Sequence, residues 1–169
     1  MITLFFDIKI KAMLLLVLST FPNLLFARTG TCILPNGINV HTKKHTLTIC
    51  QHGAVIKTFK VALGYKGIGK KRAGDNKTPV GLYNLAHPRP STQFKVFIPI
   101  LYPTSKQAAA GYTGRDVGIH GPEQATHGFH WLTNLPSATH GCIAVGKNNY
   151  IEYVANWIKE NPGTKVLIV

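Results

Sequence analysis

The feature that most limits the possible folds is a succession of short β-type segments broken by Gly and Pro. β-branched and aromatic residues alternate with polar ones over residues 46–50 and 54–63, and His52-Gly53 separates the two runs. Such alternation is typical of a strand with one buried face, and a Gly turn between two such runs indicates a β-hairpin. We therefore expect a hairpin near the start of the folded domain, preceded by a short strand at residues 38–40.

Further strand candidates follow along the chain. They cover residues 78–85, 94–98, 117–120 and 164–169. The Pro-rich connection 87–90 cannot lie inside a helix, because proline lacks the amide proton that a helical turn needs. Residues 64–77 are rich in Gly and Lys, lack the spacing of a P-loop, and are expected to form a basic loop.

Only one long helical period occurs, near the C-terminus. Apolar residues recur there at steps of three and four, namely Ile151, Val154, Trp157 and Ile158. Asn148 or Asn149 is expected to cap this helix, and Pro162-Gly163 ends it. A shorter helix is expected at residues 105–110. Many short strands with one main C-terminal helix predict a single, mostly β domain, a largely antiparallel sandwich or barrel.

The first 27 residues are expected to be a signal peptide. Two lysines precede the apolar run 12–18, and the segment ends on a small residue, Ala27. Pro22-Asn23 interrupts the apolar stretch, which therefore falls short of the about 20 residues that a membrane-spanning helix needs. We expect residues 28–169 to form an exported domain located in the periplasm or cell envelope.

The chain is strongly basic. It has 19 Lys and Arg against 6 Asp and Glu, for a formal net charge of +13. A surface of this kind favours anionic partners. For an exported protein these are lipid headgroups or the carboxylate-bearing polymer of the cell wall, and we expect no nucleic-acid partner.

The chain has three cysteines, an odd number. In an oxidising compartment an odd count predicts one disulfide and one free thiol. Cys32 and Cys50 lie close together near the start of the domain, whereas Cys142 is remote and sits in a Gly-rich turn. We expect Cys32 to pair with Cys50, which closes a loop of roughly 18 residues and contributes about 3 kcal/mol. Cys142 then stays free.

The free cysteine has the surroundings of a nucleophile. In Thr139-His140-Gly141-Cys142 the Gly allows a tight turn whose amide groups can form an oxyanion hole beside the sulfur. A thiol needs a neighbouring base to lose its proton. His120 is the first candidate, since a strand followed by Gly121-Pro122 places it at a cleft. His140 is the second, because side chains two residues apart on an extended backbone share a face.

A zinc site is the competing interpretation of these histidines. His127, His130 and His140 with Cys142 have the right ligand chemistry. However, no helix is predicted over the step from His127 to His130, and no acidic residue flanks them to orient a ligand. We therefore expect neither a metal nor another cofactor.

His120, followed after the 18 residues 121–138 by Thr139-His140-Gly141-Cys142, resembles the active-site signature of the L,D-transpeptidase catalytic domain, also called the YkuD-like domain. Upstream, Thr78-Pro79-Val80-Gly81-Leu82-Tyr83 resembles the Thr-Pro-x-Gly-x-aromatic strand of that family. The early hairpin around His52-Gly53 fits the family's usual opening, so the resemblance covers nearly the whole predicted domain.

The resemblance implies a mostly β fold and a cysteine acyltransferase acting on peptidoglycan. Cys142 would attack the carbonyl of the third residue of a stem peptide, and His120 would be the base, oriented by the carbonyl of Gly121. Thr139, His140 and Gly141 would shape the pocket and the oxyanion hole. The thioester would pass to an amine of a second stem, a lipoprotein lysine or a D-amino acid, or to water, and carbapenem-type inhibitors would acylate the cysteine.

One departure from the family pattern concerns the substrate carboxylate. Many members carry Arg two residues after the cysteine, where this chain has Ala144, and the difference marks a subgroup. Basic residues elsewhere are candidates for the missing charge, namely Lys70, Lys71, Arg72 and Arg115. A sortase would need an Arg after the cysteine, and a papain-like enzyme would place the Cys before the His. Hydrolysis of wall bonds by the same thioester route, and wall binding without catalysis, remain alternatives.

Overall fold

The computed structural model describes residues 32–124 and 137–169. Ten strands and two helices fill these ranges: β1 (Gly37–His41), β2 (Thr46–Gln51), β3 (Ala54–Gly64), β4 (Gly81–Asn84), β5 (Arg89–Ser91), β6 (Lys95–Pro99), α2 (Ser105–Ala109), β7 (Gly118–His120), β8 (Ser137–Thr139), β9 (Ile143–Val145), α4 (Asn148–Glu160) and β10 (Lys165–Ile168). The predicted signal peptide, His127 and His130 lie outside the described residues.

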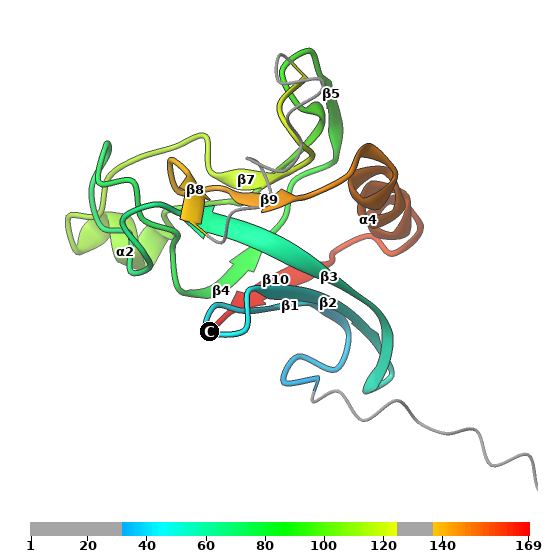
Figure 1. Ribbon diagram of the computed structural model, residues 1–169. Coiled ribbons are helices and arrows are strands. Elements are labelled where there is room, and N and C mark those ends of the chain that lie inside the picture. Colours follow the sequence, from blue (N-terminus) through cyan, green and yellow to red (C-terminus); the bar gives the residue numbers. More distant parts are fainter. Residues whose placement is uncertain (1–31, 125–136) are drawn as a thin grey trace, which may run out of the picture.

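The strands form one curled sheet in the order β4-β10-β1-β2-β3-β9-β7-β6-β5, with β8 beside β3 (Figure 1). Most neighbours are antiparallel, including the β2–β3 hairpin that the sequence predicts. The parallel pairs are β1–β10, β3–β8 and β7–β9. The mostly β fold with one main C-terminal helix is confirmed.

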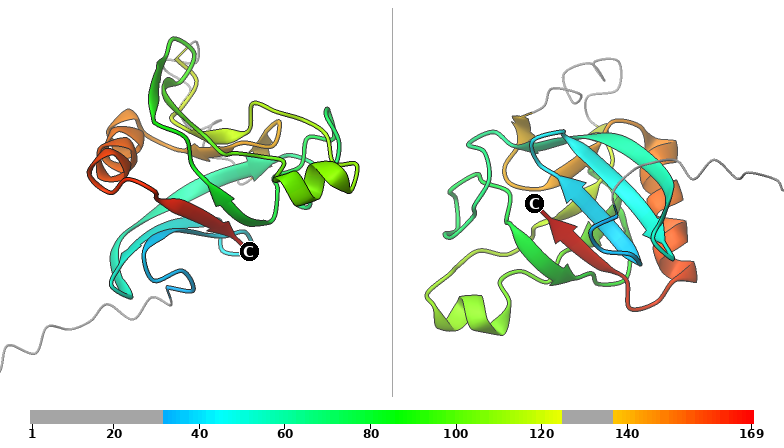
Figure 2. Two further views of the ribbon diagram at one scale, coloured as in Figure 1. Left: turned by 180° about the vertical axis from the view of Figure 1, so that it is seen from behind. Right: turned by 90° about the horizontal axis from the view of Figure 1, so that it is seen from below.

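Strand β3 joins the two halves of the sheet. Its first part pairs with β2 up to Lys60, and its next residues, Val61 and Ala62, pair with Val145 and Ala144 of β9. Because strands twist along their length, a strand of this length turns the second half of the sheet over the first. Figure 2 shows the resulting curl from behind and from below.

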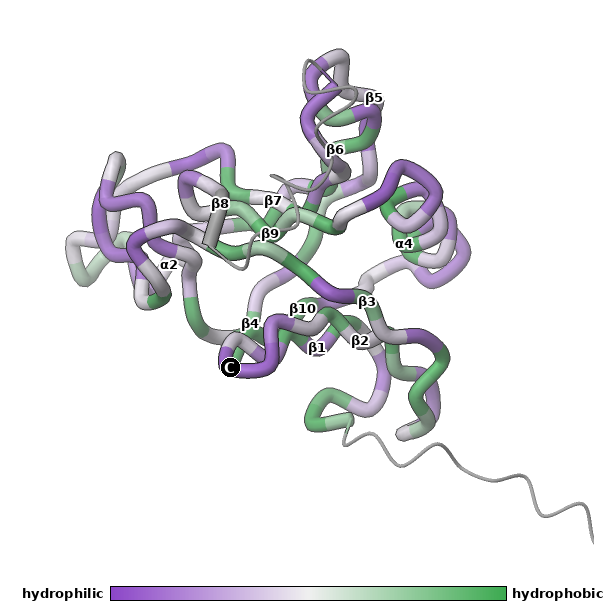
Figure 3. The backbone as a smooth tube through the Cα atoms, in the orientation of Figure 1, coloured by the Kyte–Doolittle hydropathy of each residue, from purple (hydrophilic) through white to green (hydrophobic). Residues whose placement is uncertain are grey.

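The hydrophobic core lies between the two halves. Fully buried side chains come from both, for example Ile38 and Leu47 from one half and Ile119 and Ile143 from the other. Helix α4 packs against β6 and β9 and buries four residues at helical spacing, namely Ile151, Val154, Ala155 and Ile158. Figure 3 shows hydrophobic residues on the side of α4 that faces the sheet and hydrophilic residues on its outer side.

Some predicted boundaries differ from the structure. The main helix begins at Asn148 and its N-cap residue is Lys147, so the predicted asparagine cap is wrong. The Asn148 side chain bonds to Gln124 instead, which ties the helix start to another loop. The strand expected at 78–85 is shorter, because Thr78 belongs to the preceding loop, where its Oγ1 accepts the Gly64 amide at 2.8 Å.

Two connections also become clear. The Pro-rich stretch 87–90 is not helical, as predicted, and it leads into the short strand β5. The short helix α2 has a capping box in which the side chains of Thr104 and Gln107 each accept the other's backbone amide.

No helix within residues 32–124 and 137–169 is long and apolar enough to cross a membrane.

A disulfide joins Cys32 to Cys50 of β2, with a Cα–Cα distance of 5.9 Å, and Cys142 is a free cysteine. This is the pairing that the cysteine count predicts. The bond anchors the start of the described chain to the central hairpin.

We expect thiol titration of the denatured protein to find one reactive cysteine without reductant and three after reduction. Replacing both Cys32 and Cys50 with Ser should lower the free energy of unfolding by about 3 kcal/mol, because the unfolded chain regains the freedom of the loop. Chemical denaturation measures this loss. Three thiols in the unreduced protein would contradict the pairing.

Candidate active site

His120 lies at the end of one strand, and Cys142 lies just before the start of the neighbouring parallel strand. Cys142 immediately precedes β9, His120 ends β7, and the register pairs Ile119 with Ile143 and His120 with Ala144. Because side chains two residues apart share a face of a strand, Cys142 lies on the face of Ala144 and His120. Ile119 and Ile143 fill the core on the opposite face. The topology therefore brings the two residues together one diagonal step apart.

His120 is buried and its ring is held on two sides. Its Nδ1 lies 2.7 Å from the carbonyl oxygen of Gly121, and the ring of Phe94 stacks on it with centroids 3.9 Å apart. A carbonyl only accepts, so Nδ1 carries the proton and Nε2 is left as the basic atom. Burial lowers the pKa of His120, against the opposing effects of the Gly121 carbonyl and the Glu123 charge.

The Cys142 thiol is partly buried and donates weakly to the carbonyl of Asp116, with Sγ and O 3.6 Å apart. Burial raises the pKa of Cys142. A hydrogen bond from the Gly118 backbone and the positive charge of Lys70 lower this pKa, and the Asp116 charge raises it. Burial therefore disfavours the charged forms of both groups, which favours a thiol and a neutral imidazole over an ion pair in the resting site.

Alkylation of Cys142 by iodoacetamide should therefore follow a pH profile shifted to the alkaline side. The thiolate is the reactive form, and burial raises the pKa above the ordinary cysteine value of about 8.5. The rate is expected to keep rising beyond pH 8.5, and mass spectrometry of timed samples measures it. A plateau below pH 7 would show a preformed thiolate and contradict the neutral resting pair.

The turn before the cysteine is held by Thr139. Its Oγ1 donates to the Cys142 carbonyl at 2.7 Å and accepts the Gly141 amide at 3.1 Å. Gly141 has φ of +122°, and a Cβ built there would lie 2.7 Å from the carbonyl oxygen of Lys77. The glycine predicted before the nucleophile is thus required both by backbone conformation and by a close approach of two chain segments.

Gly141→Ala is expected to cost about 2–4 kcal/mol of unfolding free energy, because it adds an overlap to the strain of a positive φ. Gly163→Ala is the matched control, since Gly163 has φ of +79° and open space where its Cβ would lie. The control should lose only about 1–2 kcal/mol. Urea denaturation compares the two, and equal losses would contradict the proposed contact with Lys77.

His140 occupies the surface beside the cysteine. Its Nδ1 lies 3.0 Å from Asn76 Oδ1, and its ring meets the edge of Tyr65 with centroids 5.5 Å apart. Unlike the buried His120, it is exposed. The structure therefore places His140 in the wall of the pocket, while His120 takes the enclosed position on the strand beside β9.

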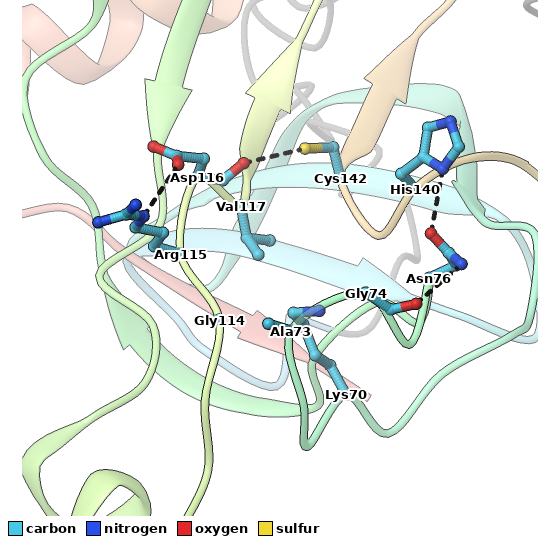
Figure 4. A pocket seen from close by; sticks show the side chains of 10 residues that line it. All are labelled: Lys70, Ala73, Gly74, Asn76, Gly114, Arg115, Asp116, Val117, His140 and Cys142. Carbon is cyan, nitrogen blue, oxygen red and sulfur yellow. Dashed lines mark hydrogen bonds and ion pairs between the residues drawn. The ribbon is translucent and has the colours of Figure 1, made fainter.

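A cavity of about 450 Å³ opens beside Cys142 (Figure 4). Its polar lining includes Lys70, Asn76, Arg115, Asp116 and His140. Of the four basic residues considered from the sequence, Lys70 and Arg115 line this cavity, whereas Lys71 and Arg72 are exposed beyond it. Asn76 and Asp116 were not predicted, because only the folded loops bring them to the sulfur.

Ala144 supplies no charge beside the cysteine. It is buried in the sheet, with Ala62 of β3 on one side and His120 on the other. A cation that contacts substrate here must therefore come from another element. Within the described ranges, no group of three or more His, Cys, Asp or Glu side chains is arranged to hold a metal ion.

The class of this protein is defined by a curled, mostly β domain with one C-terminal helix, in which a histidine ends one strand and a cysteine immediately precedes the adjacent parallel strand. Residues 35–168 match the family model of the L,D-transpeptidase catalytic domain, YkuD, and the chain belongs to this family. No curated protein sequence matches the chain significantly.

Several solved structures share the fold. The helical cell shape determining protein Pgp2 from Campylobacter jejuni has a TM-score of 0.64 and 24% identity over 78% of this chain and 46% of its own. Bd1075 from Bdellovibrio bacteriovorus has a TM-score of 0.58 and 20% identity, over 80% of this chain and 48% of its own. The Enterococcus faecium L,D-transpeptidase C442S mutant has a TM-score of 0.52 and 15% identity, over 80% of this chain and 50% of its own. The chain thus spans about half the length of these proteins.

Proposed function

We propose that this protein is an exported peptidoglycan L,D-transpeptidase with Cys142 as nucleophile and His120 as general base. The observation that carries the proposal is the placement of these two residues on the same face of β7 and β9, with the His120 ring oriented by the Gly121 carbonyl. Membership of the L,D-transpeptidase family supplies the substrate class, the stem peptides of peptidoglycan.

In the acylation step Sγ attacks the carbonyl carbon of the third stem residue while Nε2 of His120 takes the thiol proton. The Gly121 carbonyl stabilises the imidazolium through Nδ1. The imidazolium then gives its proton to the amine of the leaving D-alanine, so the peptide C–N bond breaks and a thioester remains. In the second step an acceptor amine attacks the thioester, His120 takes the amine proton, and the thiol is released.

The negative oxygen formed in both steps would be stabilised by amides of the turn 140–142. The Gly141 amide is already bound to Thr139 Oγ1, so we assign the main donor role to the amide of Cys142, which adjoins the sulfur in the chain. Thr139 then acts by fixing the turn, and His140 and Asn76 form the wall that a stem peptide contacts.

The test is an assay of the purified mature protein with disaccharide tetrapeptides, with and without a D-amino acid. Chromatography and mass spectrometry of the products identify the acceptor. A 3-3 crosslinked dimer or an exchanged fourth residue supports transpeptidation, and release of a tripeptide supports the carboxypeptidase alternative. Cleavage of an existing crosslink or wall–protein bond supports the hydrolase alternative. Binding to wall sacculi without any product would overturn the enzymatic proposal.

A role in cell shape is a further part of this proposal. One of the structurally similar proteins is named as a helical cell shape determining protein, and its likeness to this chain concerns the fold. We propose that changes in stem-peptide length or crosslinking made by this protein affect the shape of the wall. Deleting the gene and imaging the cells tests this part, and unaltered shape with altered muropeptides would separate it from the chemistry.

A further inference from the structure

Lys70 is a buried cation in the wall of the Cys142 cavity. Its side chain is 5% exposed, and Nζ lies 2.8 Å from Asp75 Oδ1 and 3.0 Å from the carbonyl oxygen of Arg72. An ammonium group has three N–H donors. Within residues 32–124 and 137–169 two of them are taken in this way, so one remains for a molecule in the cavity that Lys70 lines.

The loop around Lys70 is built to hold this ammonium in place. Asp75 also accepts three backbone amides at 2.8–3.2 Å, those of Lys71, Arg72 and Lys77. These bonds and Lys70 hold the pKa of Asp75 far below its usual value, although burial alone would raise it. On the other side Tyr102 donates its hydroxyl to the Lys70 carbonyl. Lys70 therefore presents its charge from a fixed position.

The segment that faces Lys70 places no side chain over the ammonium. A Cβ built at Gly114 would lie 3.0 Å from Lys70 Cε and 3.5 Å from Nζ, so a side chain there would cover the cation. The next residue, Arg115, also lines the cavity; its side chain is 92% exposed, and its Nε lies 3.7 Å from Oδ2 of Asp116, a carboxylate that lines the same cavity. Figure 4 shows Lys70 and Arg115 on opposite sides of Gly114.

We propose that Lys70 and Arg115 together form a receptor for a carboxylate of the donor stem peptide beside Cys142. Lys70 supplies a fixed charge with one available donor. The exposed guanidinium of Arg115, once it turns from Asp116 toward Lys70, supplies a paired donor for the second oxygen. The positive charge that Ala144 cannot supply would then come from the loops 70–77 and 114–116. The identity of the ligand rests on the proposed function, but the receptor itself does not.

The receptor can be tested with two alkylating agents of similar size, anionic iodoacetate and neutral iodoacetamide. Both form the same bond from Sγ to carbon and release iodide, so the ratio of their rates cancels changes in thiol ionisation. The ratio of the iodoacetate rate to the iodoacetamide rate is measured for Cys142 of the wild-type protein and divided by the same ratio for N-acetylcysteine. We expect the result to be about ten, a preference for iodoacetate. Mass spectrometry of Cys142 gives both rates.

Lys70→Met keeps the aliphatic stem and should lower this ratio about fivefold to tenfold. Lys71→Met, on the exposed neighbour, is the matched control and should leave the ratio unchanged. Arg115→Met tests the surface half of the receptor without touching buried contacts, and it should lower the ratio about twofold to threefold. If both Lys70→Met and Arg115→Met leave the ratio at the wild-type value, the receptor does not exist.

A second arm identifies which carboxylate is held. Donor peptides carrying a carboxamide in place of either the terminal D-alanine carboxylate or the side-chain carboxylate of the third residue are compared with the unmodified donor. The carboxylate that binds the receptor is the one whose amidation lowers kcat/KM in the wild type but not in Lys70→Met. If no peptide reacts while the alkylation ratio still depends on Lys70, the proposed function fails and the receptor stands.

Discussion

Replacing Cys142 with alanine is expected to abolish turnover of stem peptides, with kcat/KM falling by at least about 10³-fold. The reason is chemical: no other described side chain lies in the position from which the sulfur attacks, and the acyl-enzyme cannot form without it. Intact-mass spectrometry with a carbapenem gives a second readout. The wild type should gain one adduct on Cys142, and Cys142→Ala should gain none.

The fold of this variant should be nearly unchanged. Cys142 makes only weak hydrogen bonds to backbone groups, including one to the Asp116 carbonyl at 3.6 Å, and forms no disulfide. Its loss is expected to change the free energy of unfolding by less than about 1 kcal/mol. Residual turnover near the wild-type rate in a folded Cys142→Ala protein would show that another residue is the nucleophile.

Replacing His120 with alanine is expected to lower kcat by about 10²–10⁴-fold, the usual contribution of a positioned general base. Nε2 of His120 takes the thiol proton in the proposed mechanism, and the elevated pKa of Cys142 leaves little thiolate at neutral pH without it. The dependence of activity on pH should show the titration of this base in the wild type. Wild-type activity should fall on the acid side below about pH 6.5, because burial lowers the pKa of His120.

His140→Ala is the matched control for the base. His140 is exposed and bonds to Asn76, so its removal should affect substrate contact, seen as a higher KM, more than kcat. His120→Gln is a second variant that keeps a polar side chain of similar volume against Phe94. If His140→Ala loses activity while His120→Ala keeps it, the assignment of the base is wrong.

Much of the fold follows from local sequence patterns. Alternation around His52-Gly53 predicts the β2–β3 hairpin, and the three- and four-residue steps in α4 predict its buried face. The order of the strands does not follow in the same way. The pairing of Ile38 with Val166 joins segments far apart in sequence, and no local signal specifies which distant strands become neighbours.

The candidate site, too, can be predicted from the sequence only in part. Gly141-Cys142 and His120-Gly121 are recognisable because a catalytic turn needs Gly at fixed positions, and Gly141 does have the positive φ that this requires. The ring of Phe94 on His120, and the bond between Lys70 and Asp75, depend on how loops fold against each other. Their residue types are common in loops, so nothing in the sequence distinguishes them from other phenylalanines and lysines.

The position of β10 bears on when the protein can fold. β10 consists of Lys165–Ile168, the last strand of the chain, and it lies in the interior of the sheet with β1 on one side and β4 on the other. Until those residues leave the ribosome, β1 and β4 have no strand between them, and one half of the sheet stays open. Completion of this half of the sheet therefore waits for the synthesis of β10, which follows all the strands that it joins.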